Sequence, residues 1–131
     1  MRTAYALGYQ AENDLYNKLL MIGFIGRRSY KSQGPFDLMM FRDTYRPLLI
    51  EVKYYKEVND KVIGRLKKKV NTTKLIQIAQ SVQAYPLLAF KMRRLGYLFY
   101  RLDIDESYMI KYKDFRKEIA CKVLNLPPSF S

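Results

Sequence analysis

The chain has 131 residues and a formal net charge of +12, from 24 Lys and Arg against 12 Asp and Glu, with one cysteine, no histidine and no tryptophan. The absence of histidine excludes Ser-His-Asp and Cys-His catalytic sites. One cysteine supports neither an intrachain disulfide nor a structural zinc site. Any catalysis must therefore use carboxylates, lysine, tyrosine, hydroxyl groups or a hard metal ion bound by oxygen.

The composition indicates one folded domain that binds a polyanion. Apolar residues make up 49% of the chain, enough for a packed core. The longest uncharged apolar stretch, residues 19–25, is far too short to span a bilayer, and residues 1–10 lack the apolar core of a secretory signal. Because the excess charge is strongly positive, nucleic acid is the leading partner and an anionic membrane surface is second. We expect no membrane insertion.

The first predicted element is a helix over residues 3–22. Its apolar side chains recur at steps of four and three and form one stripe. These are Leu7, Ala11, Leu15, Leu19 and Ile22. Glu12 lies beside the stripe, and Gly23 supplies a C-terminal residue that can adopt a positive φ.

Three short strands are predicted next, over residues 24–30, 36–41 and 48–55, with turn-forming residues between them. The last two are expected to form a hairpin. Residues 56–71 contain six Lys and Arg against Glu57 and Asp60, and are predicted to be a mobile or partly helical basic excursion.

The rest of the chain adds a helix over residues 72–85, a strand over 86–90, a basic turn at 91–94 and a strand over 97–102. A last helix, capped by Asp114, is predicted from its apolar face of Phe115, Ile119, Val123 and Leu124. Cys121 is expected to be a small core residue near that face. The order α-β-β-β-α-β-β-α predicts an α/β fold with a mixed sheet and helices on its faces.

Two carboxylates interrupt strongly apolar strands, namely Asp37 and Glu51. A buried carboxylate is costly unless it is paired. The simpler explanation for these two acids is an edge strand or a buried salt bridge, and the other explanation is a functional site. Because side chains alternate along a strand, Glu51 and Lys53 project from one face. The hairpin register could place Asp37 beside Glu51.

This constellation suits a hard metal ion. The two carboxylates and the backbone carbonyl of Val52 are oxygen ligands of the kind that Mg²⁺ or Mn²⁺ prefers. Such an ion can bind a scissile phosphate and lower the pKa of a water molecule. Lys53 would orient that water and offset charge on the phosphate. No small-molecule cofactor is expected.

Asp37, thirteen intervening residues and Glu51-Val52-Lys53 resemble the PD-(D/E)XK nuclease motif. Residues 1–103 are similar to the archaeal-type Holliday junction resolvases, cellular and viral. Several further features of the sequence match that family: Gly8 with Glu12, Gly23-Phe24, Arg28-Ser29, Ser32, the IEVK of residues 50–53, the helix-to-strand step at 84–92, and Gly96-Tyr97.

The resemblance implies a restriction-endonuclease-like central mixed sheet flanked by helices, in a single nuclease domain over residues 1–131 with 104–131 as a C-terminal helix and tail. It implies a homodimer that nicks branched DNA at four-way junctions, inside the cell or in the cytoplasm of a virus's host. It makes Asp37 and Glu51 metal ligands and Lys53 the catalytic lysine. Glu12 would complete the acidic cluster, and Ser32 would lie in the active-site loop.

Contacts with DNA are predicted for the basic segments and for one tyrosine beside the site: Arg2, Arg27, Arg28, Lys31, Tyr54, Lys56, Arg65, Lys67, Lys68, Lys69, Arg93 and Arg94. Each assignment has a simpler alternative. The basic clusters would then be solvated surface, Glu12 an exposed helix residue, Lys53 a structural partner of Glu51, and Ser32 a turn hydroxyl. Two other functions also fit the sequence: a nuclease acting on linear duplex, flaps or single strands, and a basic DNA-binding protein without catalysis.

Overall fold

The computed structural model describes residues 3–29, 34–43 and 45–124. Its centre is a six-stranded sheet in which spatial order follows chain order. The strands are β1 (Ile25–Arg28), β2 (Leu38–Phe41), β3 (Leu48–Tyr54), β4 (Tyr85–Met92), β5 (Gly96–Arg101) and β6 (Glu106–Lys111). Only β3 and β4 pair in parallel, and the other four pairings are antiparallel.

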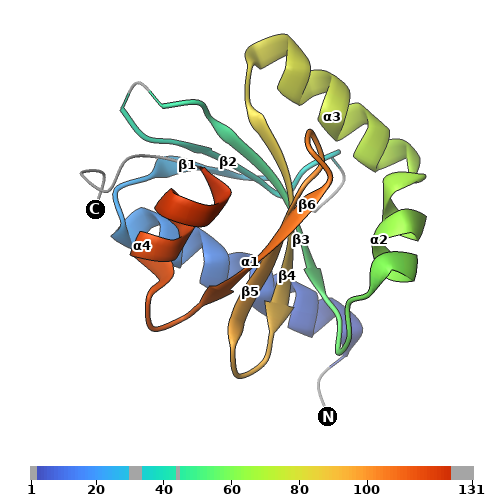
Figure 1. The fold of residues 1–131 in the computed structure, drawn as a ribbon, viewed down its shortest axis with the longest axis horizontal. Coiled ribbons are helices and arrows are strands. Elements are labelled where there is room, and N and C mark those ends of the chain that lie inside the picture. Colours follow the sequence, from blue (N-terminus) through green and yellow to red (C-terminus); the bar gives the residue numbers. More distant parts are fainter. Residues whose placement is uncertain (1–2, 30–33, 44, 125–131) are drawn as a thin grey trace.

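Helices cover both faces of the sheet (Figure 1). The parallel step from β3 to β4 requires a crossover, which α2 (Asp60–Lys67) and α3 (Val70–Val82) supply on one face. On the opposite face lie α1 (Ala4–Met21) and α4 (Phe115–Glu118), the latter continued by a π-helical turn, Ile119–Val123. The confirmed fold class is therefore α/β, with a central mixed sheet flanked by helices.

The alternation of side chains along β3 divides the core into two layers. Leu48, Ile50 and Val52 pack with the apolar stripe of α1, including the fully buried Leu15. Leu49 projects to the other face and packs with side chains of α2 and α3. Burial on both faces accounts for the almost continuous apolar run of β3, and makes the two charged residues within it more unusual.

The predicted helix over residues 3–22 is confirmed as α1. The Thr3 hydroxyl accepts a hydrogen bond from the Ala6 amide at 3.1 Å and caps its first turn. Gly23 follows the helix with φ +98°, a conformation that glycine adopts without the steric cost of a Cβ. The basic excursion over residues 56–71 is partly helical, which was one of the two predicted states, because Ile63 and Leu66 anchor α2 in the core.

Some predicted boundaries are wrong. Tyr85 begins β4 rather than ending a helix, since Gln83 adopts a left-handed conformation with φ 58° and terminates α3. Lys91 and Met92 extend β4 instead of forming a turn, because they pair with Tyr97 and Gly96 of β5.

The region after Asp103 also differs from the prediction. Strand β6 was not predicted, and its half-exposed position at the sheet edge explains its weak apolar alternation. Asp114 makes no side-chain capping hydrogen bond to α4. Cys121 is exposed, not a core residue. Within the described residues, no helix is both long enough and apolar enough to cross a membrane.

Candidate active site

The site is built on the carboxyl-terminal half of β3. Glu51 and Lys53 share one face of the strand, and Lys53 Nζ lies 2.9 Å from Glu51 Oε1. The Glu51 residue is only 9% exposed, so its charge is largely shielded from water. The predicted ion pair is therefore present and partly buried.

Asp37 lies immediately before β2 and is fixed by three hydrogen bonds. Its amide donates to the Ile50 carbonyl at 2.8 Å, and its carbonyl accepts from the Ser29 amide at 2.7 Å. Its side-chain Oδ2 accepts from the Val52 amide at 2.7 Å. The pairing of β2 with β3 begins at the next residue, Leu38, opposite Ile50. Asp37 therefore lies near Glu51, whose charge acts on it, which is the proximity that the hairpin made possible.

These groups open into one pocket of about 470 Å³, which we call the site pocket. It receives residues from α1, from the segment before β2, from β3 and from the start of α3. They are Gly8, Tyr9, Glu12, Gly34, Asp37, Glu51, Val52, Lys53, Tyr54, Tyr55 and Asn71. The three acids and the lysine predicted to form the site therefore line a common cavity, and Tyr54 lies in it as well.

Burial and like charge perturb the titration of the site. Burial, together with the nearby charges of Glu12 and Glu51, raises the pKa of Asp37 to about 6, although the Val52 amide and Lys53 oppose the shift. Burial acts to lower the pKa of Lys53, but the hydrogen bond and charge of Glu51 outweigh it and raise that pKa overall. Lys53 is therefore an ammonium ion at neutral pH, beside carboxylates that repel one another.

Glu12 enters the pocket from α1 and is 6% exposed, so the alternative of an exposed helix residue is wrong. Arg28 Nε lies 3.2 Å from Glu12 Oε1, and Arg28 Nη1 donates to Asn13 Oδ1 at 2.8 Å. Burial raises the pKa of Glu12, while the charge and hydrogen bond of Arg28 act against the increase. Arg28 is not part of the pocket lining, but it holds the Glu12 side chain that is.

The donor set fits a divalent ion held by two carboxylates. Asp37 and Glu51 offer hard oxygen ligands, and a bound cation would stabilise the Asp37 carboxylate against the burial and the neighbouring negative charges that raise its pKa. Within residues 3–29, 34–43 and 45–124, no three His, Cys, Asp or Glu side chains are arranged to hold one ion together. In this arrangement Glu12 is paired with Arg28 and does not complete a three-carboxylate site with Asp37 and Glu51.

Three residues of the site were missed by sequence reasoning. Thr72, in the first turn of α3, is fully buried and lies with Oγ1 3.5 Å from Glu51 Oε2. Asn71 and Tyr9 line the pocket. The predicted helix began at Thr72, two residues after the observed start of α3, so it omitted Asn71. Thr72 was inside the predicted helix, but the apolar periodicity did not single out a polar residue. Tyr9 shares a helix face with Glu12, three residues away, which was the available signal.

The predicted DNA-contacting residues fall at different distances from this pocket. Arg93 and Arg94 are exposed in the β4–β5 turn, which lies at the same end of the sheet as Tyr54 because Tyr54 pairs with Lys91. Lys56, Arg65, Lys68 and Lys69 are exposed on the segment joining β3 to α3, and Arg27 is exposed on β1. Arg2, Lys31 and Ser32 lie outside the described residues.

Lys67 differs from its exposed basic neighbours because it is paired: its Nζ lies 2.5 Å from Asp105 Oδ1.

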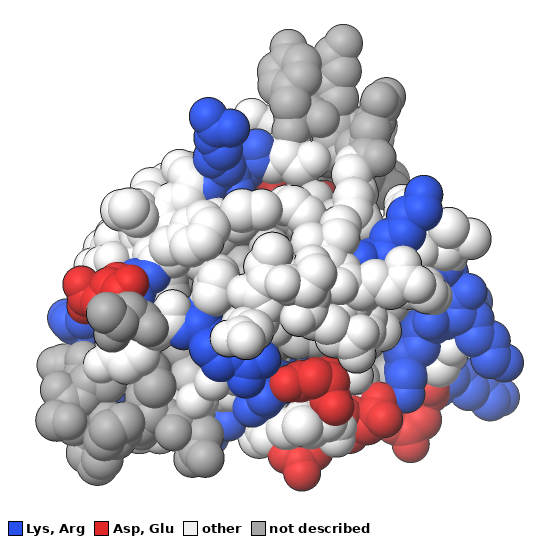
Figure 2. Space-filling view, turned by 90° about the horizontal axis from the view of Figure 1, so that it is seen from above, with Lys and Arg blue, Asp and Glu red and all other residues white. Residues whose placement is uncertain are grey.

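Figure 2 shows that charge is unevenly distributed on the face viewed from above Figure 1. A large group of Lys and Arg lies at its right edge, on the side where α2 and α3 lie in Figure 1, next to a broad uncharged area. The positive charge is thus concentrated in patches.

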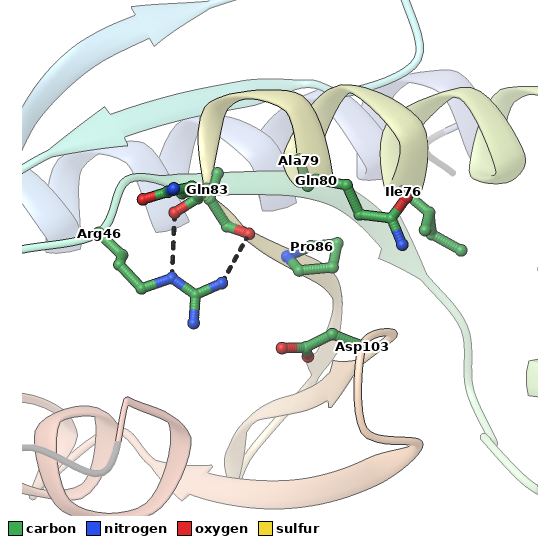
Figure 3. A pocket seen from close by; sticks show the side chains of 8 residues that line it. Arg46, Ile76, Ala79, Gln80, Gln83, Pro86 and Asp103 are labelled. Atoms are coloured by element: carbon green, nitrogen blue, oxygen red, sulfur yellow. Dashed lines mark hydrogen bonds between the residues drawn. The ribbon is translucent and has the colours of Figure 1, made fainter.

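A second pocket, of about 390 Å³, lies at the other end of the sheet and lacks this chemistry (Figure 3). Arg46 donates from Nε to the Gln83 carbonyl at 3.0 Å and from Nη2 to the Ala84 carbonyl at 3.3 Å. Its guanidinium therefore supplies hydrogen bonds to the backbone carbonyls that follow α3. Asp103 is the only carboxylate in the lining and lies 2.7 Å from Arg101. The cluster of acids with a lysine is therefore a feature of the site pocket and not of this second pocket.

Comparisons with known proteins identify a structural likeness. No protein-family model and no curated protein matches the sequence. The structure is similar to that of Hjc, a Holliday junction resolvase from the archaeal hyperthermophile Archaeoglobus fulgidus, with a TM-score of 0.57 and 21% sequence identity over 82% of this chain and 86% of that chain. The two proteins share a fold.

Proposed function

We propose that this chain is a divalent-metal-dependent DNA endonuclease that hydrolyses phosphodiesters at four-way junctions as a homodimer. The observation that carries the proposal is the convergence of Asp37, Glu51 and Lys53 in one pocket, with Lys53 2.9 Å from Glu51 and Asp37 fixed on the Val52 amide. The fold shared with a protein described as a Holliday junction resolvase supports the same conclusion.

The chain's own groups have distinct roles in this reaction. Asp37, Glu51 and the Val52 carbonyl would hold Mg²⁺ or Mn²⁺, which would supply Lewis-acid activation of the phosphate and of the attacking water. Lys53 stays protonated because Glu51 holds its pKa up, so it offsets charge that develops on the phosphate and does not act as a base. Glu12 and Arg28 hold the wall formed by α1 against the sheet.

Four-way junctions are the proposed substrate because recognition would depend on phosphate positions. The exposed basic residues on the segment joining β3 to α3 and in the β4–β5 turn flank the end of β3 that carries Lys53. Contacts of this kind fix the position of a backbone without reading bases. A junction has near two-fold symmetry, so an isologous homodimer would present two equivalent sites to it.

The decisive experiment is a cleavage assay with end-labelled immobile four-way junction, flap, linear duplex and single strand, in Mg²⁺, in Mn²⁺ and in EDTA. We expect paired nicks in the junction only with a divalent ion, and sedimentation of the protein–junction complex as two protein chains per DNA. Asp37→Asn and Glu51→Gln should abolish cleavage and retain binding. Lys74→Gln, a change at an exposed lysine outside the pocket, serves as the control.

The alternatives predict different results. A related nuclease of another specificity would cut duplex, flap or single strand at least as fast as the junction. A DNA-binding protein without catalysis would bind the junction, produce no nicks with either ion, and show no change in binding to DNA when Asp37 or Glu51 is replaced. Either result would contradict the proposed function.

A further inference from the structure

An aromatic and guanidinium stack extends from α1 to the rim of the site pocket. The Arg28 guanidinium carbon lies 4.8 Å from the centroid of the Tyr9 ring and 6.0 Å from that of Tyr16. Tyr9, Glu12, Asn13 and Tyr16 are spaced three and four residues apart, so they share the face of α1 that meets Arg28. The stack therefore has a defined order, from Tyr16 through Arg28 to Tyr9.

The inner part of this stack is rigidly held. Arg28 is bound to Glu12 Oε1 at 3.2 Å and to Asn13 Oδ1 at 2.8 Å. The Tyr16 hydroxyl donates to the Gly26 carbonyl at 3.3 Å, which joins α1 to β1. A guanidinium fixed in this way gives the Tyr9 ring a preorganised backing, which lowers the entropy cost of binding to its outer side.

The outer end of the stack is open. Tyr9 is 54% exposed and lines the same pocket as Asp37, Glu51 and Lys53. Its hydroxyl makes no hydrogen bond with any described residue, although a tyrosine hydroxyl near a protein surface commonly has a partner. Neither phosphate binding nor hydrolysis requires a large exposed aromatic ring at this position, so the ring is available to a different part of the substrate.

We propose that Tyr9 is a stacking subsite for an unpaired nucleobase next to the scissile phosphate. A base has a flat π-face that stacks on tyrosine without sequence preference, and it would extend the ladder formed by Tyr9, Arg28 and Tyr16. Bases in continuous duplex are stacked on their neighbours and cannot reach the ring, whereas a branch point can release one. The inference rests on the proposed function of this pocket and adds that a nucleotide beside the cut is released from its stack at the branch point and binds to Tyr9.

A fluorescence experiment tests the subsite without requiring cleavage. A junction carrying 2-aminopurine as an unpaired nucleotide at the branch is titrated with protein in EDTA. We expect quenching on binding by the wild type and by Tyr9→Phe, which keeps the ring, and loss of quenching with Tyr9→Leu. Because stacking on an aromatic side chain contributes about 1–3 kcal/mol per base, Tyr9→Leu should weaken this complex roughly tenfold. Binding of a fully paired duplex should change less than twofold.

The controls separate stacking from folding and from catalysis. Tyr45→Leu replaces another exposed tyrosine, outside the site pocket, and should quench like the wild type. Thermal melts of each variant identify unfolding, and Tyr9→Phe shows quenching even if Tyr9→Leu is unstable. Equal quenching by folded Tyr9→Leu, or no quenching by the wild type, overturns the subsite. If quenching depends on Tyr9 but no DNA is cut with either ion, the subsite stands and the proposed nuclease function fails.

Discussion

Lys53 Nζ lies 2.9 Å from Glu51 Oε1, and the two residues project from the same face of β3. Without a metal, the two side chains form an ion pair. In the proposed reaction, the same contact places the Lys53 ammonium beside the Glu51 carboxylate, which would bind the metal. The two roles compete for one oxygen of Glu51. Their competition leads to the first prediction.

Replacing Lys53 by methionine should separate metal binding from catalysis. The change frees Glu51 Oε1 and removes a positive charge, so the affinity for Mn²⁺ should rise severalfold when measured by calorimetry. The cleavage rate should fall by roughly 10²–10³, the effect of losing one electrostatic stabiliser of the transition state. Cleavage by Lys53→Met at the wild-type rate would contradict the role assigned to Lys53.

Asp37→Asn should stabilise the fold at neutral pH while it abolishes cleavage. The pKa of Asp37 is raised to about 6, so the folded state binds this proton more tightly than the unfolded state does. This tighter proton binding stabilises the folded protein at low pH, and the stabilisation is lost as pH rises from about 4 to 6. The asparagine variant keeps an acceptor for the Val52 amide without the charge, and should be more stable at pH 8 by on the order of 2 kcal/mol.

Denaturant melts of both proteins at pH 4, 6 and 8 measure this difference. The advantage of the asparagine variant should grow with pH and disappear near pH 4, where wild-type Asp37 is protonated as well. A wild type that is more stable than Asp37→Asn at pH 8 would show that the carboxylate is not destabilising in the fold.

Thr72→Val should impair catalysis without removing any group that lines the site pocket. The Thr72 hydroxyl is buried and lies 3.5 Å from Glu51 Oε2, so it restrains the oxygen that Lys53 leaves free. We expect a several-fold increase in the Mg²⁺ concentration needed for half-maximal cleavage, with wild-type affinity for DNA. Thr72→Ser should restore the wild-type requirement. A Thr72→Ser variant as impaired as Thr72→Val would instead indicate a packing defect.

Arg28→Ala should destabilise the protein because it leaves Glu12 buried without its cation. Breaking a partly buried pair by removing one partner costs about 2–4 kcal/mol. The pKa of Glu12 should rise further, since Arg28 opposes the increase caused by burial. Adding Glu12→Gln to Arg28→Ala should recover part of the lost stability, as a double-mutant cycle by chemical denaturation would show. A strictly additive double mutant would rule out coupling.

Binding of the junction should weaken steeply with salt, and neighbouring lysines should contribute unequally. Lys68 and Lys69 are exposed and form no ion pair with a described residue, whereas Lys67 is held by Asp105. If each free lysine releases about one counterion on binding DNA, Lys68→Gln with Lys69→Gln should reduce the slope of log affinity against log salt by about 2. Lys67→Gln, the matched control, should change it less. A complex insensitive to salt would exclude these phosphate contacts.

The sequence by itself determined the groups available for chemistry. Without histidine, and with one cysteine, any catalytic site had to use carboxylates, lysine, tyrosine, hydroxyl groups or a hard metal ion bound by oxygen. Alternation along an apolar strand was sufficient to place Glu51 and Lys53 on one face, and the short hairpin was sufficient to bring Asp37 near Glu51. These relationships are local in the chain, so residue spacing and strand periodicity predict them.

Tertiary structure decided the contacts between distant segments. Thr72 reaches Glu51, and Arg28 turns to Glu12 and Tyr9, only after α3 and α1 have packed on opposite faces of the sheet. Strand β6 was likewise recognisable only through its pairing with β5. Such contacts depend on how whole elements pack to bury apolar surface, and periodicity within one segment carries no information about its partner.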